Sequence, residues 1–241
     1  MTLTDPSFAA PNAIATISPT TFFLSHDHYF TRRMPWPFNM ILPPIETFLV
    51  LPLGRVDLIN FEPFTGIRKV QTVARNIPFA NGVSISQDGS TLAVASTTRA
   101  EVQLYSLYSN DKTDIKFITS VPVPFSVDNI AFAGDRLLAA GHPYLPEFMA
   151  LVKRKSNRAP SYVVEIVPET PEERTDHGLP RETWLARSTR PAGLSVNTTF
   201  TSDGSFLSSS SGAFMDTDMG TMFVAALYGA GVAKCGYALP L

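Results

Sequence analysis

A hairpin that begins at an asparagine is the feature that most constrains the fold of this chain. Between residues 78 and 96, apolar residues alternate with polar ones on both sides of a Gln-Asp-Gly-Ser sequence. This pattern predicts a strand, a tight turn and a second strand. Asn81 and Gly82 lie where the first strand begins, so the amide oxygen of Asn81 is a candidate ligand for a site at strand ends. The same two residues are also typical of a simple turn, and the hairpin alone leaves both interpretations open.

The same order of asparagine, strand, turn and strand occurs twice more, at residues 128–142 and 12–26. Asn81 and Asn129 are 48 positions apart, a spacing that is typical of repeated units such as the blades of a propeller. The 20 prolines of the chain argue against long helices and favour short strands joined by irregular loops. We therefore predict a modular, mostly β chain.

Composition excludes several classes of protein. A chain of 241 residues, of which 44% are hydrophobic and 17% charged, can bury a core. Its formal net charge of −2 gives no electrostatic footprint for nucleic acid, so we expect no nucleic-acid partner. Residues 1–11 lack the features of a signal peptide, and no apolar stretch is long enough to span a bilayer. The single cysteine, Cys235, excludes an internal disulfide and leaves the compartment undetermined.

Two histidines flank a carboxylate directly after the apolar residues 22–24. His26, Asp27 and His28 suggest a metal site, and a His-x-His pair on a strand is one way to bind zinc. The further Asp-His motif of such zinc hydrolases is missing, so we do not expect zinc. Alternatively, these three side chains satisfy one another and nearby backbone groups at the edge of a blade.

Four ordered motifs carry a resemblance to a known family. They are His-Asp-His-Tyr-Phe at 26–30, Phe-Ala-Asn-Gly followed by Ser-Gln-Asp-Gly at 79–89, Val-Asp-Asn-Ile at 127–130 and Gly-His-Pro at 141–143. In the order and approximate spacing of these motifs, the chain resembles the serum paraoxonase/arylesterase family. The resemblance implies an all-β, six-bladed β-propeller with two calcium ions in its central tunnel. It also implies hydrolysis of aryl esters, lactones and, in some members, organophosphate triesters. Family members are often secreted or membrane-associated.

The resemblance assigns roles to individual residues. Asn81, Asp128 and Asn129 match the family's ligands to the catalytic calcium, and Asp27 matches a ligand to the structural calcium. All four side chains are oxygen donors, which a hard cation prefers. His142 matches a position that lines the family's pocket, which makes it a candidate catalytic residue. A histidine at a strand end also serves to cap a loop, and this alternative stays open.

The chain departs from the family pattern in two ways. His26 stands where the family usually has an asparagine that binds the catalytic calcium, and imidazole is a poorer calcium ligand than an amide oxygen. Lying beside Asp27, His26 is therefore also a candidate substitute base. The chain begins about where the third blade of the family would be, so the family's upstream acidic ligands, its histidine dyad and the cysteine that would pair with Cys235 have no counterpart. We expect residues 1–241 to form a single, incomplete propeller domain with about four blades, prone to self-association through its open strand edges.

Two stretches between the motifs are interpreted as loop insertions, at about 31–54 and 153–211. In the first, Pro43, Pro44 and Glu46 interrupt an apolar run and predict a loop that leads into a strand at 47–51. Residues 34–42 fall where the family has an apolar segment that contacts lipid, but we favour a loop that packs onto the blades. The second stretch is rich in charged residues, proline, serine and threonine, and we expect much of it to be mobile.

Two hypotheses for function follow. The first is a calcium-dependent hydrolase of carboxylic esters or lactones, in which the metal polarises the carbonyl or phosphoryl oxygen and a histidine activates water. Because the family's histidine dyad has no counterpart here, we expect this chain to turn over aryl esters slowly or not at all. The second hypothesis is a non-catalytic propeller fragment, a scaffold that binds a partner through its loops.

Overall fold

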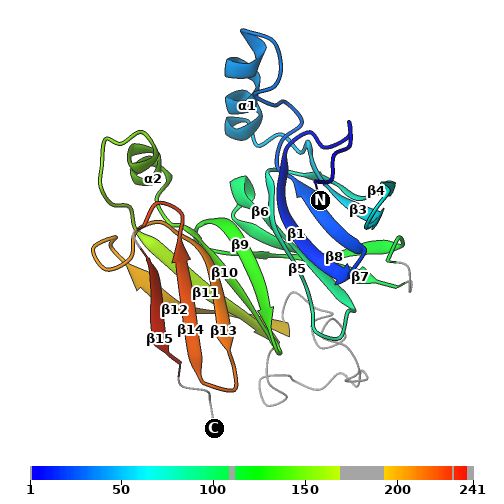
Figure 1. Cartoon of the computed structure of the whole chain (residues 1–241). Helices are drawn as coiled ribbons and strands as arrows, with labels where there is room; N and C mark the ends of the chain where they lie inside the picture. The colour runs from blue at the N-terminus through cyan, green and yellow to red at the C-terminus, as the bar shows by residue number, and fades with distance from the viewer. Residues whose placement is uncertain (1, 109–111, 169–192, 230, 238–241) are drawn as a thin grey trace.

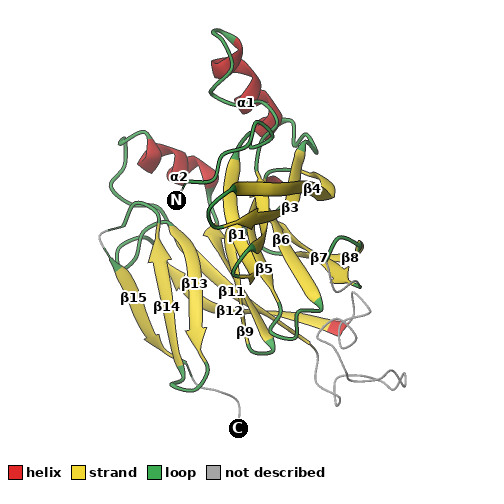
Figure 2. Cartoon of the chain, turned by 45° about the vertical axis from the view of Figure 1, so that its right-hand side comes forward, coloured by secondary structure: helices red, strands yellow, loops and turns green. Residues whose placement is uncertain are grey.

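The protein is an arrangement of four antiparallel β-sheets that form the blades of a propeller (Figures 1 and 2). The computed structural model describes residues 2–108, 112–168, 193–229 and 231–237. The predicted all-β propeller and its four blades are confirmed. The six-bladed type stays a prediction.

The strands follow one another along the chain, blade by blade. Blade one is built from β1 (Pro11–Ser18), β2 (Thr21–His26), β3 (Gly54–Glu62) and β4 (Gly66–Ile77). Blade two is built from β5 (Ala80–Ile85), β6 (Thr91–Ser96), β7 (Glu101–Leu107) and β8 (Ile115–Pro122). Blade three is built from β9 (Ser126–Ala133), β10 (Arg136–His142), β11 (Ser161–Pro168) and β12 (Leu194–Ser202). Blade four has three described strands, β13 (Ser210–Asp216), β14 (Thr221–Ala226) and β15 (Val232–Gly236).

The first strand of each blade lies next to the first strand of the next blade. β1 contacts β5, β5 contacts β9, and β9 contacts β13. These four strands therefore line the inner side of the arc, and side chains at their starts meet residues from neighbouring blades. The three predicted hairpins at 12–26, 78–96 and 128–142 are all present as strand pairs.

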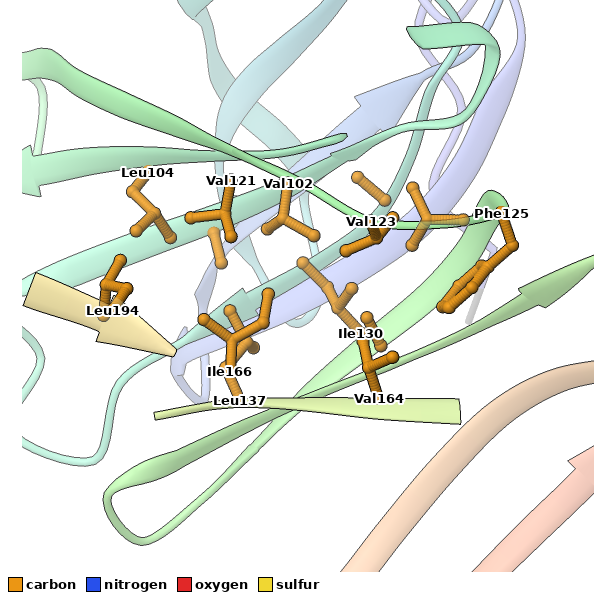
Figure 3. Packing of buried hydrophobic residues seen from close by; sticks show 14 residues of the cluster. Val102, Leu104, Val121, Val123, Phe125, Ile130, Leu137, Val164, Ile166 and Leu194 are labelled. Carbon is orange, nitrogen blue, oxygen red and sulfur yellow. The ribbon is translucent and has the colours of Figure 1, made fainter. Parts of the chain in front are cut away.

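Hydrophobic cores lie between successive blades, because each strand presents alternate side chains to opposite faces of its sheet. Between blades two and three, Leu104, Leu137 and Ile166 are fully buried, together with Val127 (Figure 3). Similar clusters pack blade one against blade two and blade three against blade four. The cores hold neighbouring inner strands at a fixed separation, which is what a site shared by two blades requires.

Two segments interpreted as loops from the sequence contain regular structure. Residues 38–48 form helix α1 (Phe38–Phe48), and the expected strand at 47–51 is absent. Both prolines lie inside this helix, in a segment that reaches away from the blades (Figure 1). The range 153–211 supplies β11 and β12, which complete blade three; the remainder of that range at 169–192 lies outside the described residues. Alternating strand patterns were hidden there by the charged and Ser/Thr-rich composition.

Trp36 and the helix α1 that follows it also do not fold onto the blades through their apolar side chains. Trp36 is 77% exposed, Met40 68% and Phe48 80%. A second helix, α2 (Leu145–Val152), lies at the same end of the molecule (Figures 1 and 2). Within the described residues, neither helix is long and apolar enough to cross a membrane.

Candidate metal and active site

The starts of β5 and β9 approach each other closely at Gly82. A Cβ atom on Gly82 would lie 2.6 Å from the Cα atom of Asn129 and 2.9 Å from the carbonyl oxygen of Asp128. Any larger residue would push the two strands apart, so this approach requires glycine. It brings Asn81, Asp128 and Asn129 together where blades two and three meet, a place that we call the blade junction.

Asn81 is held in one orientation at the blade junction. Its amide nitrogen donates to Oγ1 of Thr97 at 3.1 Å, and the Thr97 hydroxyl donates to the carbonyl oxygen of Val127 at 2.7 Å. The side-chain oxygen Oδ1 of Asn81 is buried and has no hydrogen-bond partner. An unsatisfied buried oxygen costs free energy, so it marks a place where a ligand is expected.

Asp128 supplies the negative charge of the junction. Its Oδ1 accepts a hydrogen bond of 3.2 Å from the Asn129 amide nitrogen, which also donates to the carbonyl oxygen of Ser211 at 2.8 Å. Both amide hydrogens of Asn129 are thus directed to protein acceptors. The side-chain oxygen of Asn129 is the atom that remains to bind a cation.

His142 lies against the same carboxylate. Its Nε2 is 3.5 Å from Oδ2 of Asp128, and its ring is 5% exposed. The ring stacks on Phe148 of α2, with centroids 3.7 Å apart and an interplanar angle of 14°. The other ring nitrogen, Nδ1, is buried without a hydrogen-bond partner. The blade junction therefore combines oxygen donors with an imidazole that α2 covers.

Asp27 lies in a second cluster, where β2 of blade one ends. Its Oδ2 accepts a hydrogen bond of 3.0 Å from Asn12, and its Oδ1 is 3.0 Å from Nδ1 of His28. Nε2 of His28 is 2.8 Å from the Thr47 hydroxyl on α1. Burial disfavours a charged His28 ring, but the hydrogen bond and charge of Asp27 and the charge of Glu46 outweigh burial and raise the pKa of His28. In the protonated form the ring donates to both neighbours.

Glu46 connects α1 to this second cluster through hydrogen bonds. The residue is 3% exposed, and its carboxylate accepts backbone N–H groups of Tyr29 and Phe30, each at 2.9 Å. A buried carboxylate is stable only when donors surround it, so these two bonds justify its position. The edge of the His28 ring meets Phe79 at a centroid distance of 4.7 Å. The second cluster is thus a neighbour of the blade junction, since Phe79 precedes Asn81 by two residues.

His26 points into blade one. The residue is fully buried, and its Nε2 lies 3.1 Å from Oδ2 of Asp57, which Arg55 also contacts at 3.0 Å. Burial opposes ionisation of Asp57, but hydrogen bonds from His26 and Thr72, together with Arg55, outweigh it and lower the pKa of this carboxyl. These contacts place Nε2 of His26 against the Asp57 carboxylate, and its Nδ1 is buried without a hydrogen-bond partner. The roles of His26 as a substitute base or as a calcium ligand beside Asn81 stay predictions.

The donors at the blade junction fit calcium better than a transition metal. Within the described ranges, no three His, Cys, Asp or Glu side chains lie together as metal ligands. The donors are instead one carboxylate and amide oxygens, which suit a hard cation such as calcium. The unsatisfied Oδ1 of Asn81 is the observation that favours a bound cation. Asp27, in contrast, already has partners on both of its oxygens.

The two clusters also contain three residues whose roles sequence reasoning missed: Thr97, Glu46 and Phe148. Glu46 is the only charged residue between positions 40 and 53, and a lone acid in an apolar stretch was a usable signal for a buried, partnered carboxylate. Thr97 and Phe148 gave no such signal. Their roles depend on contacts between blades and with α2, which the local pattern does not contain.

The comparisons with known proteins identify the family of this chain. The model of the family described as "Arylesterase" matches residues 1–177. The chain belongs to the arylesterase family. It is 31% identical over 136 residues to a protein named serum paraoxonase/lactonase 3 from Oryctolagus cuniculus, covering 55% of this chain and 34% of the relative. It is 31% identical over 109 residues to serum paraoxonase/arylesterase 1 from Mus musculus, covering 45% of this chain and 27% of the relative. The matched part thus spans about a third of the length of these relatives.

Solved structures confirm the propeller architecture of this arylesterase-family chain. A periplasmic gluconolactonase from Pseudomonas aeruginosa matches with a TM-score of 0.52 and 14% identity, covering 95% of this chain and 58% of that protein. A protein described as a putative 6-phosphogluconolactonase from Bacteroides uniformis also gives a TM-score of 0.52, at 10% identity, covering 96% and 53%. At these identities the likeness shows the fold alone. The likeness therefore supports the propeller fold of this arylesterase-family chain.

Proposed function

We propose that this chain is a calcium-dependent hydrolase of carboxylic esters or lactones, of the arylesterase/paraoxonase type, with its metal at the blade junction. One observation carries the proposal: the Oδ1 of Asn81 is buried without a hydrogen-bond partner, next to Gly82, which packs against the backbone of Asp128 and Asn129. An oxygen of this kind is stabilised by a hard cation. The names of the relatives point to the same class of substrate, a small ester or lactone.

Asn81, Asp128 and Asn129 would hold the cation. When bound there, calcium supplies a positive charge that stabilises negative charge developing on a carbonyl or phosphoryl oxygen. Asp128 would contribute the formal charge that attracts the cation, and the amide oxygens of Asn81 and Asn129 would add neutral ligands. The same chemistry extends to organophosphate triesters, which also develop negative charge on oxygen. Asp27 is proposed as a ligand of a second, structural calcium, although in the free chain Asn12 and His28 occupy its oxygens.

His142 is the residue placed to move a proton. Its Nε2 faces Asp128 at 3.5 Å, and Phe148 fixes the plane of its ring. We propose that His142 accepts a proton from the attacking water.

The exposed apolar side chains of Trp36 and of α1 support a second proposal, contact with a lipid surface. Trp36, Met40 and Phe48 are all more than half exposed, which is unusual for several large apolar side chains in one segment. In this proposal, residues 34–42 and α1 lie against lipid while the blade junction faces a substrate. Sedimentation with phosphatidylcholine vesicles tests it, and a triple Trp36→Ser, Met40→Ser and Phe48→Ser variant that sediments as much as the parent would exclude it.

A scaffold without catalytic activity is the competing proposal. Phenyl acetate and a δ-lactone, each assayed with calcium and with a calcium chelator, separate the two. Because the family's histidine dyad has no counterpart here, we expect slow turnover, which the chelator abolishes and His142→Asn strongly reduces. His26→Asn should preserve this turnover at temperatures where both variants stay folded. Calcium binding without turnover would favour the scaffold. Turnover that is unaffected by the chelator would contradict the calcium-dependent mechanism.

A further inference from the structure

We infer that Thr97 is a positioning residue that directs the amide oxygen of Asn81 toward the cation at the blade junction. The inference rests on the proposed function and names a side chain that neither the sequence motifs nor the relatives' names identify. Thr97 is the first residue of the short 3-10 helix Thr97–Arg99, which directly follows β6. It contacts Asn81 from the same blade and Val127 from the next blade.

The direction of the two hydrogen bonds fixes the Asn81 amide. A threonine hydroxyl has one hydrogen to donate, and at 2.7 Å from the Val127 carbonyl oxygen that hydrogen is committed to Val127. Toward Asn81, 3.1 Å away, the same hydroxyl is therefore an acceptor. Only the amide nitrogen of Asn81 donates, so this nitrogen must face Thr97. The side-chain oxygen must then face the opposite way, which is where it lies buried and unpartnered.

The arrangement costs free energy in the absence of a ligand. A buried oxygen without a donor loses its contacts with water and gains nothing in return. Rotating the amide by half a turn would place the oxygen against the Thr97 hydroxyl, but that hydroxyl has no second hydrogen to give. Thr97 therefore keeps Asn81 in the orientation that suits a cation and disfavours the one that would suit a hydrogen-bond acceptor.

The same pair of hydrogen bonds connects Asn81 to Asp128, the charged member of the site. Val127 directly precedes Asp128 in β9, and its carbonyl oxygen is the acceptor of the Thr97 hydroxyl. Gly82, directly after Asn81, packs against Asp128 and Asn129. The hydrogen bond from Thr97 to Val127 and the packing of Gly82 against Asn129 thus set the separation between blades two and three. Thr97 acts through Asn81 and Val127 and does not itself have to bind the metal.

Calcium titration calorimetry on the full chain tests this role, with calcium chloride as the probe. Thr97→Val keeps the shape of the side chain and removes both hydrogen bonds. Thr97→Ser keeps the hydroxyl and serves as the rescue variant. Thr21→Val is the matched control, because it removes a 2.8 Å hydrogen bond to Asn60 within blade one, away from the junction. Circular dichroism in chelator confirms that each variant is folded at the temperature of titration.

We expect Thr97→Val to lower the calcium association constant about tenfold, the effect of roughly one hydrogen bond. Thr97→Ser and Thr21→Val should bind as tightly as the parent. The calcium-induced rise in Tm should shrink in Thr97→Val alone, whereas a merely structural role would lower Tm equally with and without calcium. Equal affinities of the parent and Thr97→Val, or equal losses in Thr97→Val and Thr97→Ser, would overturn the inference and leave the proposed function intact. A parent that binds no calcium would overturn the metal site itself.

Discussion

The blade junction and the cluster at the end of β2 contain similar side chains but differ in how their polar atoms are satisfied. At the end of β2, Asp27 and Glu46 accept hydrogen bonds from protein donors on every side. At the blade junction, Asn81 Oδ1 and His142 Nδ1 are buried without partners. His26, the last residue of β2, also has a buried ring nitrogen without a hydrogen-bond partner, so the contrast between the two clusters lies in their oxygen atoms. Because an unsatisfied buried oxygen costs free energy, Asn81 Oδ1 indicates a ligand, whereas the partnered oxygens of Asp27 and Glu46 indicate a structural role.

The two clusters also belong to different parts of the architecture. The cluster at the end of β2 joins blade one to α1, the element that carries exposed apolar side chains. The junction joins two blades through their inner strands, and a buried hydrophobic core packs the same two blades together. We therefore assign metal binding mainly to the blade junction. The main role that we assign to the cluster at the end of β2 is to anchor α1.

The largest expected effect comes from closing the gap at the junction. Gly82→Ala places a methyl group 2.6 Å from the Asn129 Cα atom, so we expect a loss of about 3 kcal/mol of unfolding free energy, at the upper end of overpacking. We also expect loss of calcium binding, since the strands must move apart. Urea unfolding and calcium titration measure both effects.

Gly231→Ala is the matched control for this prediction, because a Cβ atom there has no neighbour within 4 Å. It should change stability and calcium affinity little. A Gly82→Ala protein as stable as Gly231→Ala would show that the two inner strands do not approach as closely as described.

Charge removal compares the two clusters directly. Asp128→Asn should weaken calcium binding by about tenfold to a hundredfold, because a formal charge is lost at the cation. The effect of Asp128→Ala should likewise exceed that of Asn129→Ala. Asp27→Asn should leave the tightest calcium binding unchanged, since Asp27 is held by Asn12 and His28. Calorimetry on the matched pair decides the assignment, which fails if Asp27→Asn weakens the tightest site more than Asp128→Asn does.

Glu46→Gln tests the anchoring role of the cluster at the end of β2. The carboxylate accepts backbone N–H groups of Tyr29 and Phe30, and its neutral replacement should cost about 1–2 kcal/mol of stability. Hydrogen exchange at these two amides should accelerate, and calcium affinity at the junction should not change. Unchanged exchange at both amides would refute the anchoring role.

The smallest expected effect is on the thermal stability of the protein at acidic pH. The pKa of Asp57 is lowered from its ordinary value of 3.8, so its ionised form stabilises the folded state above that value. This contribution is lost as the pH falls through the lowered pKa. Between pH 5 and pH 3, about one unit either side of an ordinary aspartate, Asp57→Asn should therefore show a shallower fall in Tm than the parent.

Asp203→Asn is the control in this pH series. The pKa of Asp203 is also lowered, mainly by Ser205, but its hydrogen bonds are exposed and contribute little to stability. Its Tm profile should follow that of the parent. A parent and Asp57→Asn with parallel profiles would show that the contacts of His26 and Arg55 to Asp57 do not stabilise blade one.

The sequence predicted the blades well, because strand and turn patterns are local. The hairpins that contain Asn81 and Asn129 were readable from alternation and turn residues, and a shared motif spacing gave the family. Helix α1 was missed because two prolines normally exclude a helix interior. In the structure both prolines lie within it, so the general rule was a poor guide to this segment.

The candidate site was only partly predictable. Asn81, Asp128 and Asn129 could be grouped from their motifs, but the motif could not show that His26 turns toward Asp57. Which face of a strand a side chain occupies depends on the register with its neighbours, and so does the partner that it meets. Thr97 was invisible for the same reason, since its partners lie 16 and 30 positions away.

Calorimetric titration of the parent chain and Asn81→Leu with calcium chloride, after removal of bound metal with a chelator, tests the central claim most directly. The account predicts saturable heat from the parent and its loss in Asn81→Leu, which is similar in size but has no side-chain oxygen. It also predicts that Asn60→Leu, in blade one, keeps the parent's affinity. Absence of calcium-dependent heat in the parent, or undiminished binding in Asn81→Leu, would contradict a cation site at the blade junction.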